Sequence, residues 1–201
     1  MKTAILGWGS LLWDTRVEFD ATHGPWEPHG PSLPIEFSRI SATRGGALTL
    51  VVDHQFGTWC SSAFSVSNRT CPDDAIADLS LREGTTLKNI GFYFANGSRR
   101  QSCAAETLKA VEKWDRLRDF DVVVWTDLKS NFAAKSKLKQ SFSVVNAFAH
   151  LQLLPADVKA KAADYISRAP SFVDTPLRRA IKTEPWFETL AKQTITEGKH
   201  A

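Results

Sequence analysis

A chain of 201 residues is long enough to bury a full core without disulfides or a structural metal. Its hydrophobic content of 43% argues against a disordered protein. The net charge of +3 is uneven, because residues 129–201 hold 12 Lys/Arg against 6 Asp/Glu while residues 1–128 hold 13 against 16. We interpret the basic third as a solvated helical face, since no aromatic or Arg-Gly pattern lies between its alternating lysines, Lys135, Lys137 and Lys139.

Cysteine usage and the N-terminal residues indicate a soluble protein of the cytoplasm. Three cysteines are an odd number without CxxC spacing, which fits reduced thiols better than a disulfide framework. The apolar run Ala4–Leu6 is too short for a signal peptide or a membrane span. We therefore expect a cytoplasmic protein with no membrane partner. The sequence does not predict the oligomeric state.

In chain order, a β-rich half precedes a helical half. Short apolar or alternating runs that end at turn residues predict strands over 3–8, 34–40, 47–52, 58–66, 90–95 and 120–125, with a Pro/Gly/His-rich loop over 20–33. Capping signals and apolar spacing predict helices over 72–83, 104–118, 141–153, 156–168, 175–182 and 185–196. Strands first and helices late favour an α+β fold, and the lack of a linker or repeat favours one domain over 1–201.

The first candidate site is the turn that follows the first predicted strand. Gly7-Trp8-Gly9-Ser10 places two glycines where the backbone must come close to a ligand, and its amides can form an anion-binding concavity. A carboxylate or a developing oxyanion would fit there, and Ser10 adds a hydroxyl. The structural alternative is a plain turn with Trp8 in the core. A dinucleotide fingerprint is excluded, because Leu12 stands where its third glycine belongs.

The second candidate is Glu83, at the end of the predicted helix over 72–83. Ile76, Leu79 and Glu83 are spaced to lie on one helix face, so the pattern places a carboxylate on the stripe that faces the core. Burial and the negative end of the helix dipole would both raise its pKa, as a general base near neutral pH requires. The structural alternative is a helix-end glutamate paired with Arg82 or a lysine.

Other candidate residues favour structural roles. Nothing places Cys60 beside His54, and a buried thiol in a strand is the better interpretation of Cys60. His23 and His29 fit no metal spacing, so no metal is predicted. His150 lies beside apolar helix residues and is expected at the edge of the core.

The two candidate motifs, in this order, resemble the gamma-glutamylcyclotransferase-like family. That family has an N-terminal strand followed by Tyr-Gly-Ser-Asn/Leu-Leu, and residues 8–12, Trp-Gly-Ser-Leu-Leu, stand in that place. A later family helix ends in Leu-Asp-x-x-Glu-Gly, which residues 79–84 match as Leu-Ser-Leu-Arg-Glu-Gly. A late helix, a Leu-Pro turn and a further helix are also similar to the family. The stretch 85–119 matches it poorly.

The resemblance implies a small mixed β-barrel with flanking helices and an enzyme that needs no cofactor. The α-amine of a gamma-glutamyl substrate would attack its own side-chain carbonyl, giving 5-oxoproline and a released amine. Glu83 would be the general acid/base. The backbone and side chains of Gly7, Trp8, Gly9, Ser10 and Leu11 would bind the substrate.

Three departures from the family pattern affect the expected pocket. Trp8 replaces the family's tyrosine, Leu11 stands where many members have asparagine, and the strand that begins Trp59-Cys60-Ser61-Ser62 lacks the glycine often found there. Ser80 also replaces the aspartate of the helix-end pattern. We expect Trp125, in a strand that would line the same barrel, to rebuild part of the pocket wall.

Two other function classes compete with this hypothesis. One is a non-catalytic module of the same fold that holds a small ligand. The other is a nucleic-acid-associated protein that uses the basic C-terminal third, a class that ranks last, so no nucleic-acid partner is predicted.

Overall fold

The computed structural model describes residues 1–190. The chain divides into two compact units, and each is assembled from two separate segments. The first unit comprises Met1–Leu33 and Ser61–Leu128, and the second comprises Pro34–Cys60 and Lys129–Ala201. The single domain predicted over 1–201 remains a prediction.

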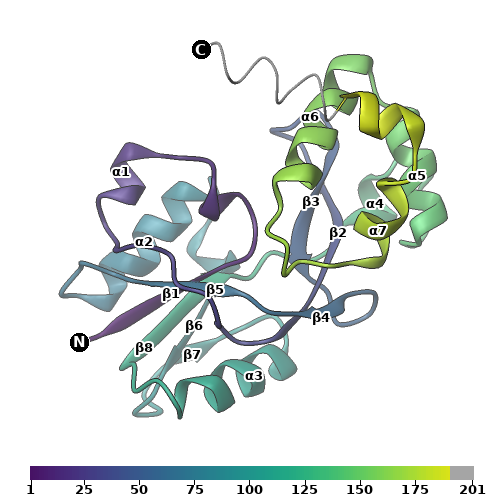
Figure 1. Ribbon diagram of the computed structural model, residues 1–201. Helices are drawn as coiled ribbons and strands as arrows, with labels where there is room; N and C mark the ends of the chain where they lie inside the picture. Colours follow the sequence, from purple (N-terminus) through teal and green to yellow (C-terminus); the bar gives the residue numbers. More distant parts are fainter. Residues whose placement is uncertain (191–201) are drawn as a thin grey trace. The chain divides into compact units, whose positions relative to one another are not determined.

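A five-stranded mixed sheet forms the centre of the first unit (Figure 1), in the order β5-β1-β8-β6-β7. β1 pairs in parallel with β8 and antiparallel with β5, while β6 pairs antiparallel with both β8 and β7. The strands are β1 (Thr3–Gly7), β5 (Ala63–Val66), β6 (Ile90–Phe94), β7 (Arg100–Gln101) and β8 (Val122–Thr126).

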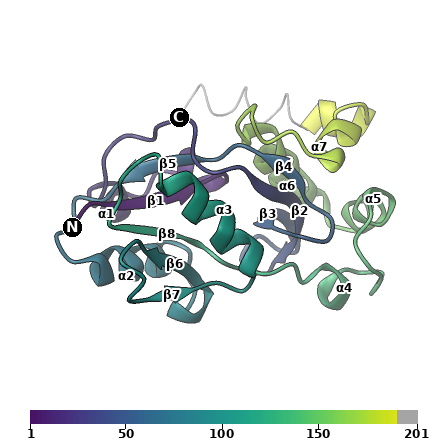
Figure 2. The ribbon, with the colours of Figure 1, turned by 90° about the horizontal axis from the view of Figure 1, so that it is seen from below.

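Helices cover both faces of this sheet, which explains why every residue of β1 is buried. On one face, α2 (Pro72–Arg82) packs Ile76 and Leu79 against Ile5 and Val124, next to the short α1 (Val17–Asp20). On the other face lies α3 (Ala105–Asp115), which Figure 2 shows running across β1 and β8. Two short 3-10 helices, η1 (Ser10–Leu12) and η2 (Leu87–Asn89), complete the unit.

The second unit contains a three-stranded sheet in the order β3-β2-β4. Its strands are β2 (Leu33–Ser41), β3 (Ala47–Val52) and β4 (Thr58–Cys60). Its helices are α4 (Phe132–Lys135), α5 (Val144–Gln152), α6 (Ala156–Arg168) and α7 (Pro176–Ile181). α6 packs along β3, where the Leu50 amide donates to the Tyr165 hydroxyl at 3.4 Å.

The α+β prediction is confirmed, and the strand pairings within residues 1–190 form two open sheets rather than a closed barrel. The single strand predicted over 58–66 is wrong. That stretch forms two strands of different sheets, because Ser61 and Ser62 interrupt it and the Ser62 carbonyl accepts from the Gly30 amide. β7 and α4 were not predicted. Residues 185–190 are helical as predicted, and 191–196 lie outside the described residues.

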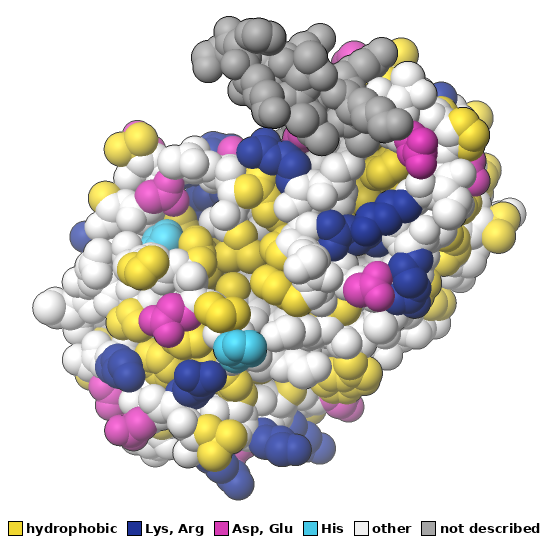
Figure 3. Space-filling model, in the orientation of Figure 1, with side chains coloured by type: hydrophobic (Ala, Val, Ile, Leu, Met, Phe, Trp, Pro, Cys, Tyr) yellow, Lys and Arg dark blue, Asp and Glu magenta, His cyan; other side chains and the backbone are white. Residues whose placement is uncertain are grey.

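Two predictions concern the surroundings of the protein: that it has no membrane partner and that its basic C-terminal third is a solvated helical face. Within residues 1–190, none of the helices combines the length and the apolar composition needed to cross a membrane. Basic and acidic side chains are interspersed over the face shown in Figure 3. Ion pairs within single helices, Lys161–Asp157 and Arg168–Asp164, account for part of the basic third. These pairs fit the interpretation of that third as a solvated helical face.

Candidate functional site

β1 ends in a turn whose first residue must be glycine. A Cβ on Gly7 would lie 2.8 Å from the ring of Trp26 and 3.1 Å from the Leu12 side chain. The distance to the ring is shorter than Cβ contacts in real proteins. Trp8 and Leu11 then point into the core, where they are 5% and 8% exposed. The indole of Trp8 is therefore a buried core side chain.

The turn itself is closed by carbonyl oxygens. The Gly9 carbonyl accepts from the Leu12 amide at 3.0 Å, and the Ser10 carbonyl accepts from the amides of Trp13 and Asp14 at 3.2 and 2.8 Å. These bonds use the amides at the end of the turn. The amides at its start, those of Ser10 and Leu11, lie outside the turn's own bonds, as at any helix N-terminus.

Arg82 joins the end of α2 to this turn. Its guanidinium Nη2 donates to the Ser10 carbonyl at 3.3 Å and to the Asp14 carbonyl at 2.7 Å, and it lies 3.6 Å from the Asp14 carboxylate. The Arg82 side chain is only 5% exposed and also lies over the ring of Phe19. Hydrogen bonds from a buried cation are strong, so the residue next to Glu83 holds the helix end on the loop.

Glu83 is the C-cap residue that follows α2, and it sits in a defined helix-ending turn. Gly84 follows with φ +58°, its amide donates to the Leu81 carbonyl at 3.0 Å, and the Thr85 amide donates to the Ser80 carbonyl at 3.0 Å. This pair of bonds is the Schellman motif. The Ser80 hydroxyl adds a bond to the Thr85 carbonyl at 2.8 Å, so the serine that replaces the family aspartate fastens this turn.

The expected burial of Glu83 is only partly correct. Ile76 and Leu79, which share its helix face, are buried at 4% and 0% exposure, but Glu83 itself is half-buried. Glu83 follows Arg82, the last residue of α2, so it lies beyond the helix that carries Ile76 and Leu79.

Trp125 does not lie on the face that carries α2. Its indole is fully buried over Gly91, and its neighbour Val124 is the one that packs against α2, because successive strand residues point to opposite faces. The indole Nε1 donates to the Asp127 carboxylate at 3.2 Å, which also accepts from the Cys103 amide. The structure therefore does not bring Trp125 to Glu83's side of the sheet.

A pocket of about 360 Å³ opens beside the same turn, and no pattern in the sequence predicts it. Its walls come from residues 11–26: Leu11, Leu12, Trp13, Thr15, Asp20, His23, Gly24 and Trp26. A smaller pocket of about 190 Å³ lies between α1 and the end of α2, lined in part by Arg16, Asp78 and Arg82.

His23 contributes an unusual polar atom to the larger pocket. The side chain is 8% exposed, and its ring lies between those of Phe19 and Trp26. Nδ1 lies 2.6 Å from the Gly24 carbonyl, which only accepts, so we assign the proton to Nδ1. Within the described residues Nε2 has no hydrogen-bond partner, and the nearest acid is Asp20, whose Oδ1 lies 3.8 Å away.

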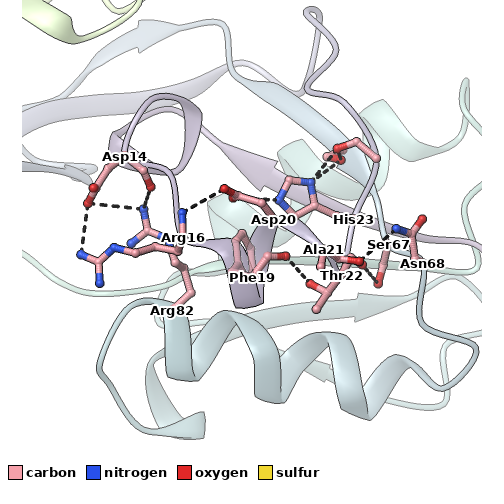
Figure 4. Close-up of polar contacts among 12 residues, drawn as sticks. Asp14, Arg16, Phe19, Asp20, Ala21, Thr22, His23, Ser67, Asn68 and Arg82 are labelled. Atoms are coloured by element: carbon pink, nitrogen blue, oxygen red, sulfur yellow. Dashed lines mark hydrogen bonds and ion pairs between the residues drawn. The ribbon is translucent and has the colours of Figure 1, made fainter. Parts of the chain in front are cut away.

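Figure 4 shows the polar contacts of Arg82, Asp14, Arg16, Asp20 and His23. Arg82 and Arg16 both meet the carboxylate of Asp14, at 3.6 and 3.2 Å. The Arg16 amide donates to Asp20 Oδ2 at 2.9 Å, and Asp20 in turn faces His23. The loop over residues 8–26 therefore links the end of α2 to the His23 pocket.

The other sequence candidates have structural surroundings. Cys60 is buried, and burial raises the pKa of its thiol, which makes it a poor nucleophile. His150 is 1% exposed, so it is a core residue as expected. His29 is exposed at φ 68°, with its carbonyl accepting from the Trp114 indole. Residues 1–190 contain no group of three or more metal-ligating acidic, His or Cys side chains.

Comparison with known proteins adds no relative. Protein-family models, curated proteins and solved structures all give no match to this chain.

Proposed function

We propose that this chain is a gamma-glutamylcyclotransferase-like enzyme that cleaves a gamma-glutamyl amide to 5-oxoproline and an amine. Membership in that family is part of the same proposal. The observation that carries it is the attachment of the α2 end to the Gly9-Ser10 turn by Arg82. Glu83 follows Arg82 in the chain, so its backbone belongs to the same helix end that Arg82 attaches to this turn.

The reaction requires only one group that moves a proton. The substrate's α-amine attacks its own side-chain carbonyl carbon and forms the ring C–N bond, while Glu83 removes the proton from the attacking nitrogen. The tetrahedral oxyanion then collapses and the original amide C–N bond breaks. Glu83 returns the proton to the leaving nitrogen and is regenerated. The turn amides of Ser10 and Leu11 hold the glutamyl group.

Local structure supports this assignment of the base. Glu83 ends a helix, where the helix dipole is negative and favours the protonated carboxyl. The Schellman turn and the Ser80 hydroxyl fix the backbone on both sides of it. Close packing at Gly7 and burial of Trp8 define the start of the turn, while Trp125 is buried on the other face of the sheet.

The reaction class is tested by mass spectrometry of 5-oxoproline released from gamma-glutamyl dipeptides, glutathione and gamma-glutamyl amines. We expect at least one compound to give 5-oxoproline and its amine in equal amounts. The matched control is the same compound with its α-amine acetylated, which has no nucleophile and must give no product. Ordinary glutamate in place of 5-oxoproline would show hydrolysis and contradict intramolecular attack. No product from any compound would leave the non-catalytic binding module as the better account.

A further inference from the structure

The pocket formed by residues 11–26 has a polar end and an apolar end. At the polar end, Asp20 Oδ1 and His23 Nε2 lie 3.8 Å apart, too far for a hydrogen bond but close enough to share one donor group between them. At the apolar end lie Leu11, Leu12 and the rings of Trp13 and Trp26. Its volume of about 360 Å³ falls within the range of small-molecule sites.

Both polar groups of this end accept hydrogen bonds. The Nδ1 proton of His23 is committed to the Gly24 carbonyl, and the Ser65 hydroxyl donates to the same carbonyl at 2.6 Å. Nε2 therefore presents a lone pair. Leaving a buried acceptor unpaired is costly, so this atom indicates a missing donor.

The charge of Asp20 is not neutralised by its neighbours. Arg16 directs its guanidinium to Asp14 and gives Asp20 only its backbone amide, at Oδ2. The described residues show no Lys or Arg ion pair to Asp20. The second oxygen, Oδ1, lies 3.8 Å from His23 Nε2, and both residues line the pocket. An anionic ligand would be repelled here, and a metal would find only two ligands among the described residues.

We infer that this pocket binds a primary ammonium group attached to a small apolar body. The ammonium donates to Asp20 Oδ1 and His23 Nε2, and the apolar body lies against Leu11, Trp13 and Trp26. An ammonium has three donors and no acceptor, which matches an end with two converging acceptors. Indole faces also attract cations. Binding of such a ligand goes beyond the proposed reaction and does not require turnover.

Benzylammonium is the probe that tests it, by isothermal titration calorimetry with the full chain. Benzyl alcohol has the same body without the charge, and benzoate reverses the charge. We expect benzylammonium to bind saturably at one site, benzyl alcohol to bind at least about tenfold more weakly, and benzoate to show no binding. Equal or tighter binding of benzoate, or no saturable binding of benzylammonium, would overturn the inference and leave a pocket that holds only water.

Variants separate the two acceptors from general loop damage. Asp20→Asn should weaken benzylammonium about tenfold or more, while Glu18→Gln, an equal charge change on the same helix, should leave it unchanged. His23→Asn keeps a donor for the Gly24 carbonyl but deletes Nε2, and should weaken binding. His23→Gln restores an acceptor near Nε2 and should recover part of the affinity. Equal affinities for wild type and Asp20→Asn would refute the site.

Discussion

At the scale of single residues, the hydrogen bonds of His150 define its protonation state. Its Nδ1 accepts from the Lys137 amide at 3.1 Å, and its Nε2 lies 2.8 Å from the Gly46 carbonyl, so the proton sits on Nε2. Burial lowers the pKa of this imidazole. A proton added to Nδ1 would face an amide N–H, which explains physically why the neutral form is preferred.

This arrangement predicts how stability depends on pH. Because the folded pKa is depressed, the contribution of His150 is fully present above the unfolded value of about 6.5 and is lost as pH falls through the folded pKa. The urea midpoint of the wild type should therefore fall more between pH 7.5 and 5.5 than that of His150→Gln, which cannot titrate. Parallel falls for the two proteins would contradict the assignment.

Gly7 is a residue where neighbouring side chains leave little room for a Cβ. Gly7→Ala should destabilise the protein by about 1–3 kcal/mol, because its Cβ would meet the ring of Trp26 at 2.8 Å. Gly24→Ala is the control, since its Cβ would lie 3.7 Å from the nearest atom and should cost little. Urea unfolding measures both. A Gly7→Ala variant as stable as Gly24→Ala would mean that Trp26 can move without cost.

At the scale of elements, the end of α2 depends on a left-handed glycine. Gly84 has φ +58° and a Cβ there would meet nothing within 4 Å, so a substitution acts through backbone conformation alone. Gly84→Ala should cost about 1 kcal/mol in urea unfolding, and Gly84→Asn should cost less, because asparagine tolerates this region better. Equal stability of the alanine variant and the wild type would show that the turn ends differently.

The elements also show where sequence patterns succeed and where they fail. α2 was predicted almost to the residue, because Pro72, the two aspartates and Gly84 are local signals that tertiary packing does not override. The pattern of 34–40 was interpreted as a strand with polar residues alternating, yet Glu36 and Ser38 are both fully buried. Thr175 donates a hydrogen bond to Glu36, and Asp53 accepts one from Ser38. Local alternation in the sequence cannot reveal these partners.

Of the candidate site, the turn after β1 and the helix end at Glu83 were predictable, because glycines and capping residues act locally. The link between them was not, since Arg82 reaches Ser10 across about seventy positions of sequence. Trp125 was assigned to the pocket wall, whereas its strand parity directs it to the other face. The sequence does not indicate that His23 lines a pocket, because its unpaired nitrogen depends on carbonyl positions that only the fold defines.

At the scale of the whole molecule, the chain forms two units, each from two segments. The crossings lie at residues 33–34, 60–61 and 128–129, and only the first of them follows a Pro/Gly/Ser-rich stretch, residues 28–34. This is why composition alone favoured a single domain. Every residue of the proposed site lies in the first unit, so the proposed chemistry does not depend on how the two units are arranged.

The role of Glu83 is decided by the rate of 5-oxoproline release by wild type, Glu83→Gln and Glu18→Gln on the best substrate of the panel. We expect Glu83→Gln to lose at least about a hundredfold in kcat with its fold intact, because it removes the proton carrier. Glu18→Gln, an exposed glutamate on α1, should keep full activity. An active Glu83→Gln variant would contradict the assignment of Glu83 as the general acid/base.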